Sequence, residues 1–126
     1  MEGNNLSRNV TLSLVTILLE PEREVYLVDV TTLGHEAFSI ADDNGRTLQL
    51  VLESSKIIKV FFDIRNDSDA LFSLFGIRVS GIEDLQLIEL ASRTFGKRNV
   101  NGLARCIERD GTINLIERKR WQAVKD

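Results

Sequence analysis

The chain has 126 residues, of which 43% are hydrophobic and 28% charged, so it is long enough for one folded domain and too short for a second domain with its own core. One proline and 8 glycines exclude collagen-like and low-complexity classes. A single cysteine and a single histidine exclude an internal disulfide and a zinc site built from Cys and His ligands.

The charge is unevenly distributed along the chain. Residues 93–126 hold 9 Lys and Arg against 4 acids, whereas residues 1–92 hold 7 against 15. The net charge of -3 gives no reason to expect a membrane-surface binder, so an anionic partner would have to meet the basic C-terminal part. The sequence lacks a secretory signal and a membrane-length apolar run, which predicts an intracellular protein, cytoplasmic or nuclear, without a membrane partner.

Two strands are predicted near the N-terminus. Residues 10–19 (VTLSLVTILL) alternate and then become apolar on both faces, which is typical of a strand covered on both sides. Residues 25–30 (VYLVDV) follow after a hairpin-length connection, so an antiparallel pair is expected. His35 lies in a predicted turn that enters a helix, where we expect a surface or packing role.

A turn, a helix and a third strand are predicted next. The polar run 42–45 (DDNG) indicates the turn, and Leu48, Val51 and Leu52 are spaced as on one face of a short helix. The apolar run 57–62 (IIKVFF) predicts a buried strand.

The helix expected after this strand has signals at both ends. Asn66 is a candidate N-cap and Gly76 a candidate C-terminal stop. Between them, Leu71, Phe72 and Phe75 are expected to face inward.

Helices account for most of the remaining predicted structure, over residues 82 or 83 to 95, 100–108 and 113–124. Strands come early and helices are interleaved and then follow. The predicted fold class is therefore α/β, a mixed sheet flanked by helices with a helical, basic C-terminal third. A single domain over residues 1–126 is expected, because neither a repeat nor a linker is visible.

The densest group of polar side chains is the segment 63–69 (DIRNDSD), directly after a predicted strand. Ligands of open α/β sheets bind at the carboxyl ends of strands, and carboxylate oxygens suit Mg²⁺ or Mn²⁺. The alternative is structural, because Asp67 and Asp69 also suit the first turn of a helix. The sequence has no glycine-rich phosphate loop, and only His35 is available to a Ser or Cys nucleophile, which disfavours P-loop and triad hydrolases.

Six segments in chain order carry a family resemblance: MEGNNLSR, LSLVTILLEP, VYLVDVTTLG, IIKVFFDIRNDSDALFSLFGI, EDLQLIELASR and VNGLARCIE. Together they resemble the ribonuclease D-type 3'-5' exonuclease domain of the DEDD superfamily, especially its fungal members. The most specific part is KVFFDIRNDSDALFSLFGI followed by DLQL. The resemblance implies a ribonuclease H-like fold and two-metal hydrolysis of nucleic-acid phosphodiesters from the 3' end, with Mg²⁺ or Mn²⁺ held by four acids in the order Asp, Glu, Asp, Asp.

Two of these four acids match residues of the chain. Glu2-Gly3 matches the second half of the motif Asp-x-Glu-Gly, which implies that Glu2 is a metal ligand and orients the attacking water. Asp67 matches the second-motif Asp, with Asp63 and Asp69 as lower-ranked alternatives.

The other two acids have no match. The first would lie two residues before Glu2, ahead of Met1, and residues 100–126 contain no Tyr-x-x-x-Asp motif. The resemblance therefore implies a domain truncated at both ends. Three hypotheses remain: a 3'-5' exonuclease acting on RNA or DNA, a non-catalytic nucleic-acid-binding or scaffold module of the same fold, and a fragment that is unstable alone.

The basic C-terminal part is a candidate nucleic-acid surface. Four cations lie on or between predicted helices and could follow a phosphate backbone: Arg93, Lys97, Arg98 and Arg105. The alternative for each is a solvated helix face.

Overall fold

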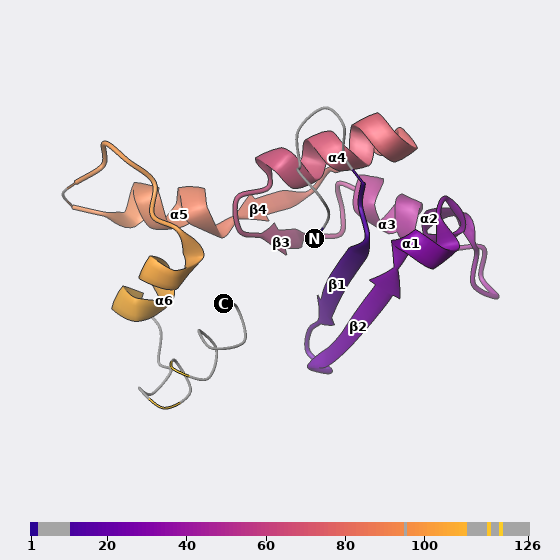
Figure 1. Ribbon diagram of the computed structural model, residues 1–126, viewed down its shortest axis with the longest axis horizontal. Helices are drawn as coiled ribbons and strands as arrows, with labels where there is room; N and C mark the ends of the chain where they lie inside the picture. Colours follow the sequence, from indigo (N-terminus) through magenta and orange to yellow (C-terminus); the bar gives the residue numbers. More distant parts are fainter. Residues whose placement is uncertain (3–10, 95, 111–115, 117–118, 120–126) are drawn as a thin grey trace. The chain divides into compact units, whose positions relative to one another are not determined.

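The computed structural model describes residues 1–2, 11–94, 96–110, 116 and 119. The chain forms two compact units, residues 1–84 and 85–126. The first unit, called unit 1, contains β1 to β4 and α1 to α4, and the second, called unit 2, contains α5 and α6 (Figure 1). In the described ranges, no helix is long and apolar enough to cross a membrane.

Unit 1 begins with the antiparallel hairpin that the sequence predicts. Strand β1 (Leu14–Leu19) pairs with β2 (Glu24–Asp29) along its whole length. On the other edge of β1, Glu2 forms an isolated antiparallel bridge with Leu14. The Glu2 amide donates to the Leu14 carbonyl at 3.0 Å, and the Leu14 amide donates to the Glu2 carbonyl at 3.2 Å. Two backbone bonds therefore fix Glu2 beside β1.

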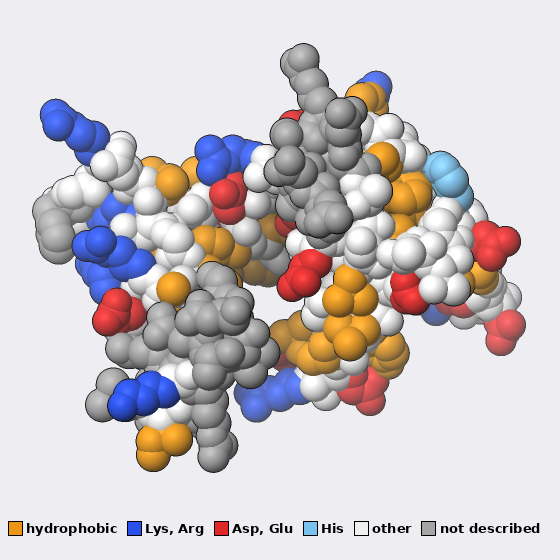
Figure 2. Space-filling model, in the orientation of Figure 1, with side chains coloured by type: hydrophobic (Ala, Val, Ile, Leu, Met, Phe, Trp, Pro, Cys, Tyr) orange, Lys and Arg blue, Asp and Glu red, His pale blue; other side chains and the backbone are white. Residues whose placement is uncertain are grey.

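The prediction that the first strand is covered on both faces is wrong for its described residues. Val15 is buried, but Leu18 is 56% exposed and Leu27 of β2 is 67% exposed. Figure 2 shows hydrophobic side chains at the surface of this hairpin. Only one face of the hairpin packs against the core of unit 1. The apolar side chains on its other face are exposed to solvent. Val10, where the predicted strand begins, lies outside the described residues.

Three short helices follow the hairpin: α1 (Val30–Leu33), α2 (Glu36–Ser39) and α3 (Leu48–Glu53). His35 immediately precedes α2, as predicted for a turn entering a helix. The predicted turn at 42–45 is confirmed, because the Gly45 amide donates to the Asp42 carbonyl at 2.9 Å. Helix α3, also predicted, begins where the Thr47 hydroxyl accepts a hydrogen bond from the Leu50 amide.

A second, parallel strand pair completes unit 1. Strand β3 (Lys59–Phe61) pairs with β4 (Ile82–Asp84), so that Phe61 lies opposite Asp84. The described residues therefore form two separate two-stranded sheets rather than the single mixed sheet that the sequence predicts. The architecture is nevertheless mixed α/β.

Strand β3 is shorter and more exposed than predicted. Only three residues of the run 57–62 pair, and Ile58 and Val60 are 64% and 56% exposed. The predicted helix start at Ile82 or Glu83 is also wrong, because β4 occupies residues 82–84 and the helix begins at Leu85.

Helix α4 (Arg65–Phe75) connects the two strands of this pair. Its predicted stop is confirmed, because Gly76 adopts a left-handed conformation with φ 67° and its amide donates to the Phe72 carbonyl. Asn66 is not the cap, since it lies inside the helix and is exposed. Phe72 is 51% exposed rather than inward, and the Arg78 guanidinium lies 5.3 Å from its ring centroid.

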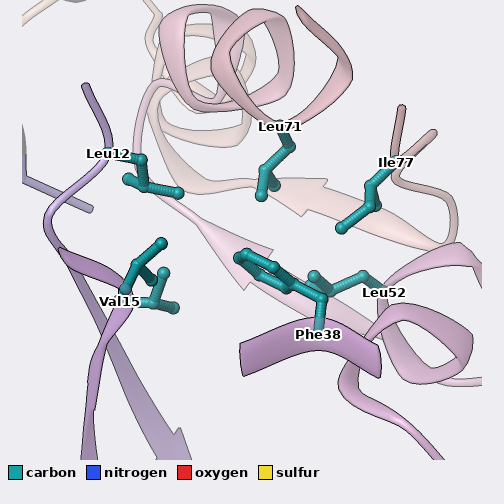
Figure 3. Close-up of a cluster of buried hydrophobic side chains, with 7 residues drawn as sticks. Leu12, Val15, Phe38, Leu52, Leu71 and Ile77 are labelled. Atoms are coloured by element: carbon teal, nitrogen blue, oxygen red, sulfur yellow. The ribbon is translucent and has the colours of Figure 1, made fainter. Parts of the chain in front are cut away.

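The core of unit 1 lies between the hairpin, the short helices and α4. Figure 3 shows Leu71 of α4 and Phe38 of α2 directed toward one another, with Val15 of β1 beside them. Leu71 and Phe38 are 0% and 2% exposed, and the buried cluster also contains Leu12, Val30, Leu52 and Ile77. This packing anchors α4, and α4 carries the acids that follow β3.

Unit 2 contains α5 (Leu85–Ser92) and α6 (Leu103–Asp110). Helix α6 begins three residues later than predicted. The Gln86 side chain is buried and donates to the Asn101 carbonyl at 2.9 Å, which ties the start of α5 to the segment before α6. The predicted helix 113–124 lies outside the described residues, apart from Ile116 and Lys119.

Candidate functional site

The candidate site begins where β3 and β4 end side by side. Parallel strands place their carboxyl ends at the same edge, and here this edge brings Asp84 next to the loop after β3. The Asp84 carboxylate accepts a hydrogen bond from the Asp63 amide and another from the Ile64 amide, each at 3.0 Å. Asp63 has φ 56°, in the left-handed region that Asp tolerates better than most residues. The loop therefore turns sharply into α4 over the Asp84 carboxylate.

Asp63 itself is paired with a cation. Its two oxygens accept from Nε and Nη2 of Arg65 at 2.7 and 2.9 Å. This hydrogen-bonded pair lowers the pKa of Asp63 below its ordinary value. With both oxygens bound to one guanidinium, Asp63 is a poor candidate for a metal ligand, which agrees with its lower rank in the sequence analysis.

Asp67 differs from Asp63 in both environment and partners. It lies in the first turn of α4 and is partly buried. Among the described residues, no hydrogen bond or ion pair reaches its carboxylate. Burial raises the pKa of Asp67, the Met1 amino group lowers it to a smaller extent, and the charge of Asp63 raises it further. The carboxylate is thus partly desolvated and has no hydrogen-bond donor among the described residues, which leaves its oxygens open to a ligand.

Glu2 enters the same region from the N-terminal residues. Its backbone is fixed to β1 and its side chain is exposed. Because the Met1 amino group acts electrostatically on Asp67, the residue adjoining Glu2 lies within electrostatic reach of that carboxylate. Asp69, the other alternative acid, is exposed on α4.

Oxygen donors of the kind that Mg²⁺ and Mn²⁺ prefer are therefore present at Glu2 and Asp67. Across the described ranges, however, no group of three or more His, Cys, Asp or Glu residues lies close enough together to hold a metal ion. The donor chemistry fits the expected divalent cation, but the described residues supply only part of a two-metal ligand set.

Arg93 has a structural role that the sequence analysis did not anticipate. Its side chain is 6% exposed and donates from Nε and Nη2 to Glu89 at 2.8 and 2.6 Å. Its Nη1 donates to the Gly96 and Asn99 carbonyls, each at 2.8 Å. The guanidinium therefore holds the segment between α5 and α6, and we correct its assignment as a phosphate-binding residue.

The other three candidate cations are at the surface. Lys97 and Arg98 lie in the segment between α5 and α6, and Arg105 lies on α6; all three are exposed. Figure 2 shows Lys and Arg side chains gathered over this part of unit 2. Lys97 donates weakly to the Ala91 carbonyl at 3.4 Å, so it can turn toward a ligand at little cost.

Sequence reasoning gave Lys59 and Asp84 no role, although both shape the site. Lys59 Nζ donates to the Val51 and Ser54 carbonyls at 2.8 and 2.5 Å and so binds β3 to the end of α3. Burial lowers the pKa of Lys59. The pairing of β3 with β4 places Asp84 opposite Phe61, at the end of β3. The sequence did not reveal this neighbour, because residues 82–84 have no strand pattern of their own.

A sequence profile for the 3'-5' exonuclease family matches residues 1–109. The chain belongs to this family. It is 35% identical over 89 residues to the mouse piRNA biogenesis protein EXD1, a match that covers 71% of the chain and 14% of that relative. The human protein of the same name is also 35% identical and is covered over 16% of its length. The chain thus spans less than a fifth of these relatives.

Solved structures agree with this family membership. Trypanosoma brucei RNase D in complex with RNA U12 matches with a TM-score of 0.66 and 28% identity, over 81% of this chain and 33% of that one. The EXD2 exonuclease domain soaked in Mn matches with a TM-score of 0.55 and 22% identity, over 97% of this chain and 66% of that one. The second likeness concerns the fold alone. Both confirm a mixed α/β exonuclease fold, although its sheets are small here.

Proposed function

We propose that the chain is a 3'-5' exonuclease domain that removes nucleotides from the 3' end of RNA or DNA, with Asp67 and Glu2 among the ligands of a divalent cation. The observation that carries the proposal is the desolvated Asp67 carboxylate, which has no protein partner among the described residues. Its helix begins shortly after the carboxyl end of β3, and α/β folds bind ligands at the carboxyl ends of their strands. Membership of the exonuclease family supports this reaction type.

Each acid then has a distinct part in the proposed chemistry. Divalent cations, when bound, would supply the positive charge that activates a water and stabilises the leaving 3' oxygen. Asp67 offers a fixed carboxylate on a helix anchored in the core of unit 1. Glu2 offers an exposed carboxylate that can orient the attacking water. Asp63 remains paired with Arg65 and keeps that cation beside the site.

The proposed substrate is a nucleic-acid strand with a free 3' end. RNase D, which shares this fold, was solved with RNA and with GMP. In this chain the exposed cations of unit 2, Lys97, Arg98 and Arg105, are the groups proposed to contact phosphates. Phosphate contacts of this kind weaken as salt is added, because bound counterions are released on binding.

One observation favours a second function, that of a non-catalytic nucleic-acid-binding or scaffold module of the same fold. The described residues contain no group of three metal-binding side chains, so they do not by themselves form a two-metal site. Such a module would keep the fold and the exposed cations and bind oligonucleotides without turnover.

A nuclease assay separates the two functions. Release of 3'-terminal nucleotides from labelled single-stranded RNA and DNA is measured with and without Mn²⁺, in the parent chain, in Asp67→Asn and in the control Asp69→Asn. The proposal predicts Mn²⁺-dependent release that falls about 100-fold in Asp67→Asn and changes less than about twofold in Asp69→Asn, because Asp69 is an exposed acid on the same helix. Salt-sensitive binding without release would favour the module, and equal loss in both variants would remove Asp67 from its proposed role.

A further inference from the structure

The Asp84 carboxylate makes an unusual connection between two segments of unit 1. One oxygen accepts from the Asp63 amide and the other from the Ile64 amide, both at 3.0 Å. These two residues are 21 and 20 positions away in sequence and lie across the parallel β3–β4 pair. The contact therefore closes the whole strand–helix–strand segment at the edge where the candidate site lies.

The two amides occupy the point at which the chain enters α4. Asp63 has a left-handed conformation with φ 56°, which costs free energy in a residue other than glycine, although Asp tolerates it better than most. Ile64 precedes the helix, and its carbonyl accepts the first helical bond, from the Ser68 amide at 2.8 Å. Its amide has no acceptor inside the helix, and Asp84 supplies one. Asp67 lies in the same first turn.

We propose that Asp84 is a positioning residue for Asp67: its two oxygens fix the Asp63–Ile64 turn and thereby the first turn of α4 that presents the Asp67 carboxylate. The positioning of Asp67 toward a cation rests on the proposed function. The fixing of the turn does not, because it depends only on the two hydrogen bonds. Arg65 is held mainly by its hydrogen bonds to Asp63, and the charge of Asp84 acts on Arg65 in the same direction to a smaller extent.

Only a carboxylate satisfies this geometry. Its two oxygens accept from two separate amides, whereas the side chain of Asn has one acceptor and one donor group. In Asp84→Asn, an NH₂ group would face a backbone N–H, so one bond is lost and one contact becomes repulsive. In Asp84→Ala, both amides lose their acceptor. The two variants therefore form a graded series. Glu83→Gln, next in sequence and exposed, removes the same charge without touching the loop.

The first test is amide hydrogen exchange on the full chain, read residue by residue by NMR. In the parent chain and in Glu83→Gln, the amides of Asp63, Ile64 and Ser68 are expected to be protected. Their exchange should accelerate at least about tenfold in Asp84→Asn and further in Asp84→Ala, because hydrogen-bonded amides exchange through local opening. Unchanged protection of Ile64 and Ser68 in Asp84→Ala would overturn the proposal.

The second test measures Mn²⁺ affinity by electron paramagnetic resonance of the free ion. Groups that orient a metal ligand without touching the metal typically contribute 10- to 100-fold to affinity, so Asp84→Asn should weaken binding by about tenfold or more. Val15→Ala, a cavity variant in the core, controls for lost stability and should keep the parent affinity when folded. Equal weakening in both variants would reduce Asp84 to a structural residue and contradict the proposal.

The two tests distinguish failure of the proposed function from failure of the positioning role of Asp84. If the parent chain binds no Mn²⁺, the proposed function fails, while the exchange rates still decide whether Asp84 fixes the turn. If Mn²⁺ binds at Asp67 and the exchange rates are unaffected by Asp84, the proposed function stands and the positioning role is wrong.

Discussion

Two acidic side chains, Glu89 of unit 2 and Asp67 of unit 1, have opposite electrostatic environments. In unit 2, Glu89 is 13% exposed and is surrounded by donors, with Arg93 at 2.6 Å and Arg109 at 3.9 Å. The hydrogen-bonded Arg93 side chain lowers the pKa of Glu89. In unit 1, by contrast, burial raises the pKa of Asp67, which has no such donor among the described residues.

Under the proposed function, this difference separates a structural charge from a carboxylate that is available to a ligand. The Glu89–Arg93 pair satisfies its own hydrogen-bonding groups and holds the segment that leads to α6. Asp67 has no hydrogen-bond or ion-pair partner among the described residues, and Asp84 holds the Asp63–Ile64 loop that leads into its helix. Perturbed carboxyl groups without a protein partner are the better candidates for function.

The largest loss of stability in unit 1 is expected from Gly81→Ala, at the start of β4. Gly81 precedes β4 with φ +64°, and an added Cβ would lie 2.7 Å from the Ile57 carbonyl oxygen and 2.8 Å from that of Ser54. The backbone must move, so we expect a loss of about 3 kcal/mol in the free energy of unfolding. Urea unfolding followed by circular dichroism measures it.

Gly45→Ala is the matched control for this change. Gly45 has φ +75° but nothing within 4 Å of an added Cβ, so only the conformational cost of about 1 kcal/mol remains. Equal losses in the two variants would show that crowding at the β3–β4 edge is unimportant.

The ion pair of unit 2 is tested by Arg93→Met, which keeps the apolar stem and removes the guanidinium. Glu89 would lose its main partner and keep only the longer contacts with Asn101 and Arg109, and the Gly96 and Asn99 carbonyls would lose their donor. We therefore expect the melting midpoint to fall by about 8 °C. Arg98→Met removes an exposed cation and should leave the midpoint within about 1 °C. Oligonucleotide binding should respond in the opposite order: Arg98→Met should weaken binding and reduce its salt dependence more than Arg93→Met does. A stable Arg93→Met variant would contradict the structural role.

The smallest effects are those of single acids on the pH dependence of stability. The pKa of Asp63 is lowered in the folded chain, so its contribution is present above the ordinary Asp pKa and is lost as pH falls through the lowered value. The pKa of Asp67 is raised, so its contribution is present at low pH and is lost as pH rises through the raised value.

Asp63→Asn and Asp67→Asn should therefore shift the melting midpoint in opposite directions. At pH 7, Asp63→Asn is expected to lower the melting midpoint by about 2 °C and Asp67→Asn to raise it by about 1 °C. The Asp67 difference should shrink as pH falls below its raised pKa, and the Asp63 difference should shrink only at lower pH, because each neutral acid resembles the amide. Scanning calorimetry across this range measures both, and shifts of the same sign at pH 7 would contradict the comparison.

Local signals in the sequence predicted much of unit 1. The hairpin, the turn at 42–45 and the stop at Gly76 each depend on residues close together in the chain. Asp67 was selected because its position matched a family motif, and its partial burial came only from the structure.

Long-range contacts account for what the sequence did not reveal. Residues 82–84 form a strand only because β3 lies beside them, so their pattern was interpreted as the start of a helix. Arg93 was assigned to phosphate because it lies in the basic C-terminal part of the chain, but its guanidinium donates to the Gly96 and Asn99 carbonyls instead. The role of Asp84 depends on amides 20 and 21 residues away.

The most direct test of the central claim, that Asp67 is a cation-binding carboxylate, is Mn²⁺ titration of the isotopically labelled chain followed by NMR. Paramagnetic broadening at substoichiometric Mn²⁺ is predicted to begin at the amides of Asp67 and Glu2 and to disappear in Asp67→Asn. Broadening that begins at the exposed acids Asp42 and Asp43, or that persists unchanged in Asp67→Asn, would contradict the claim.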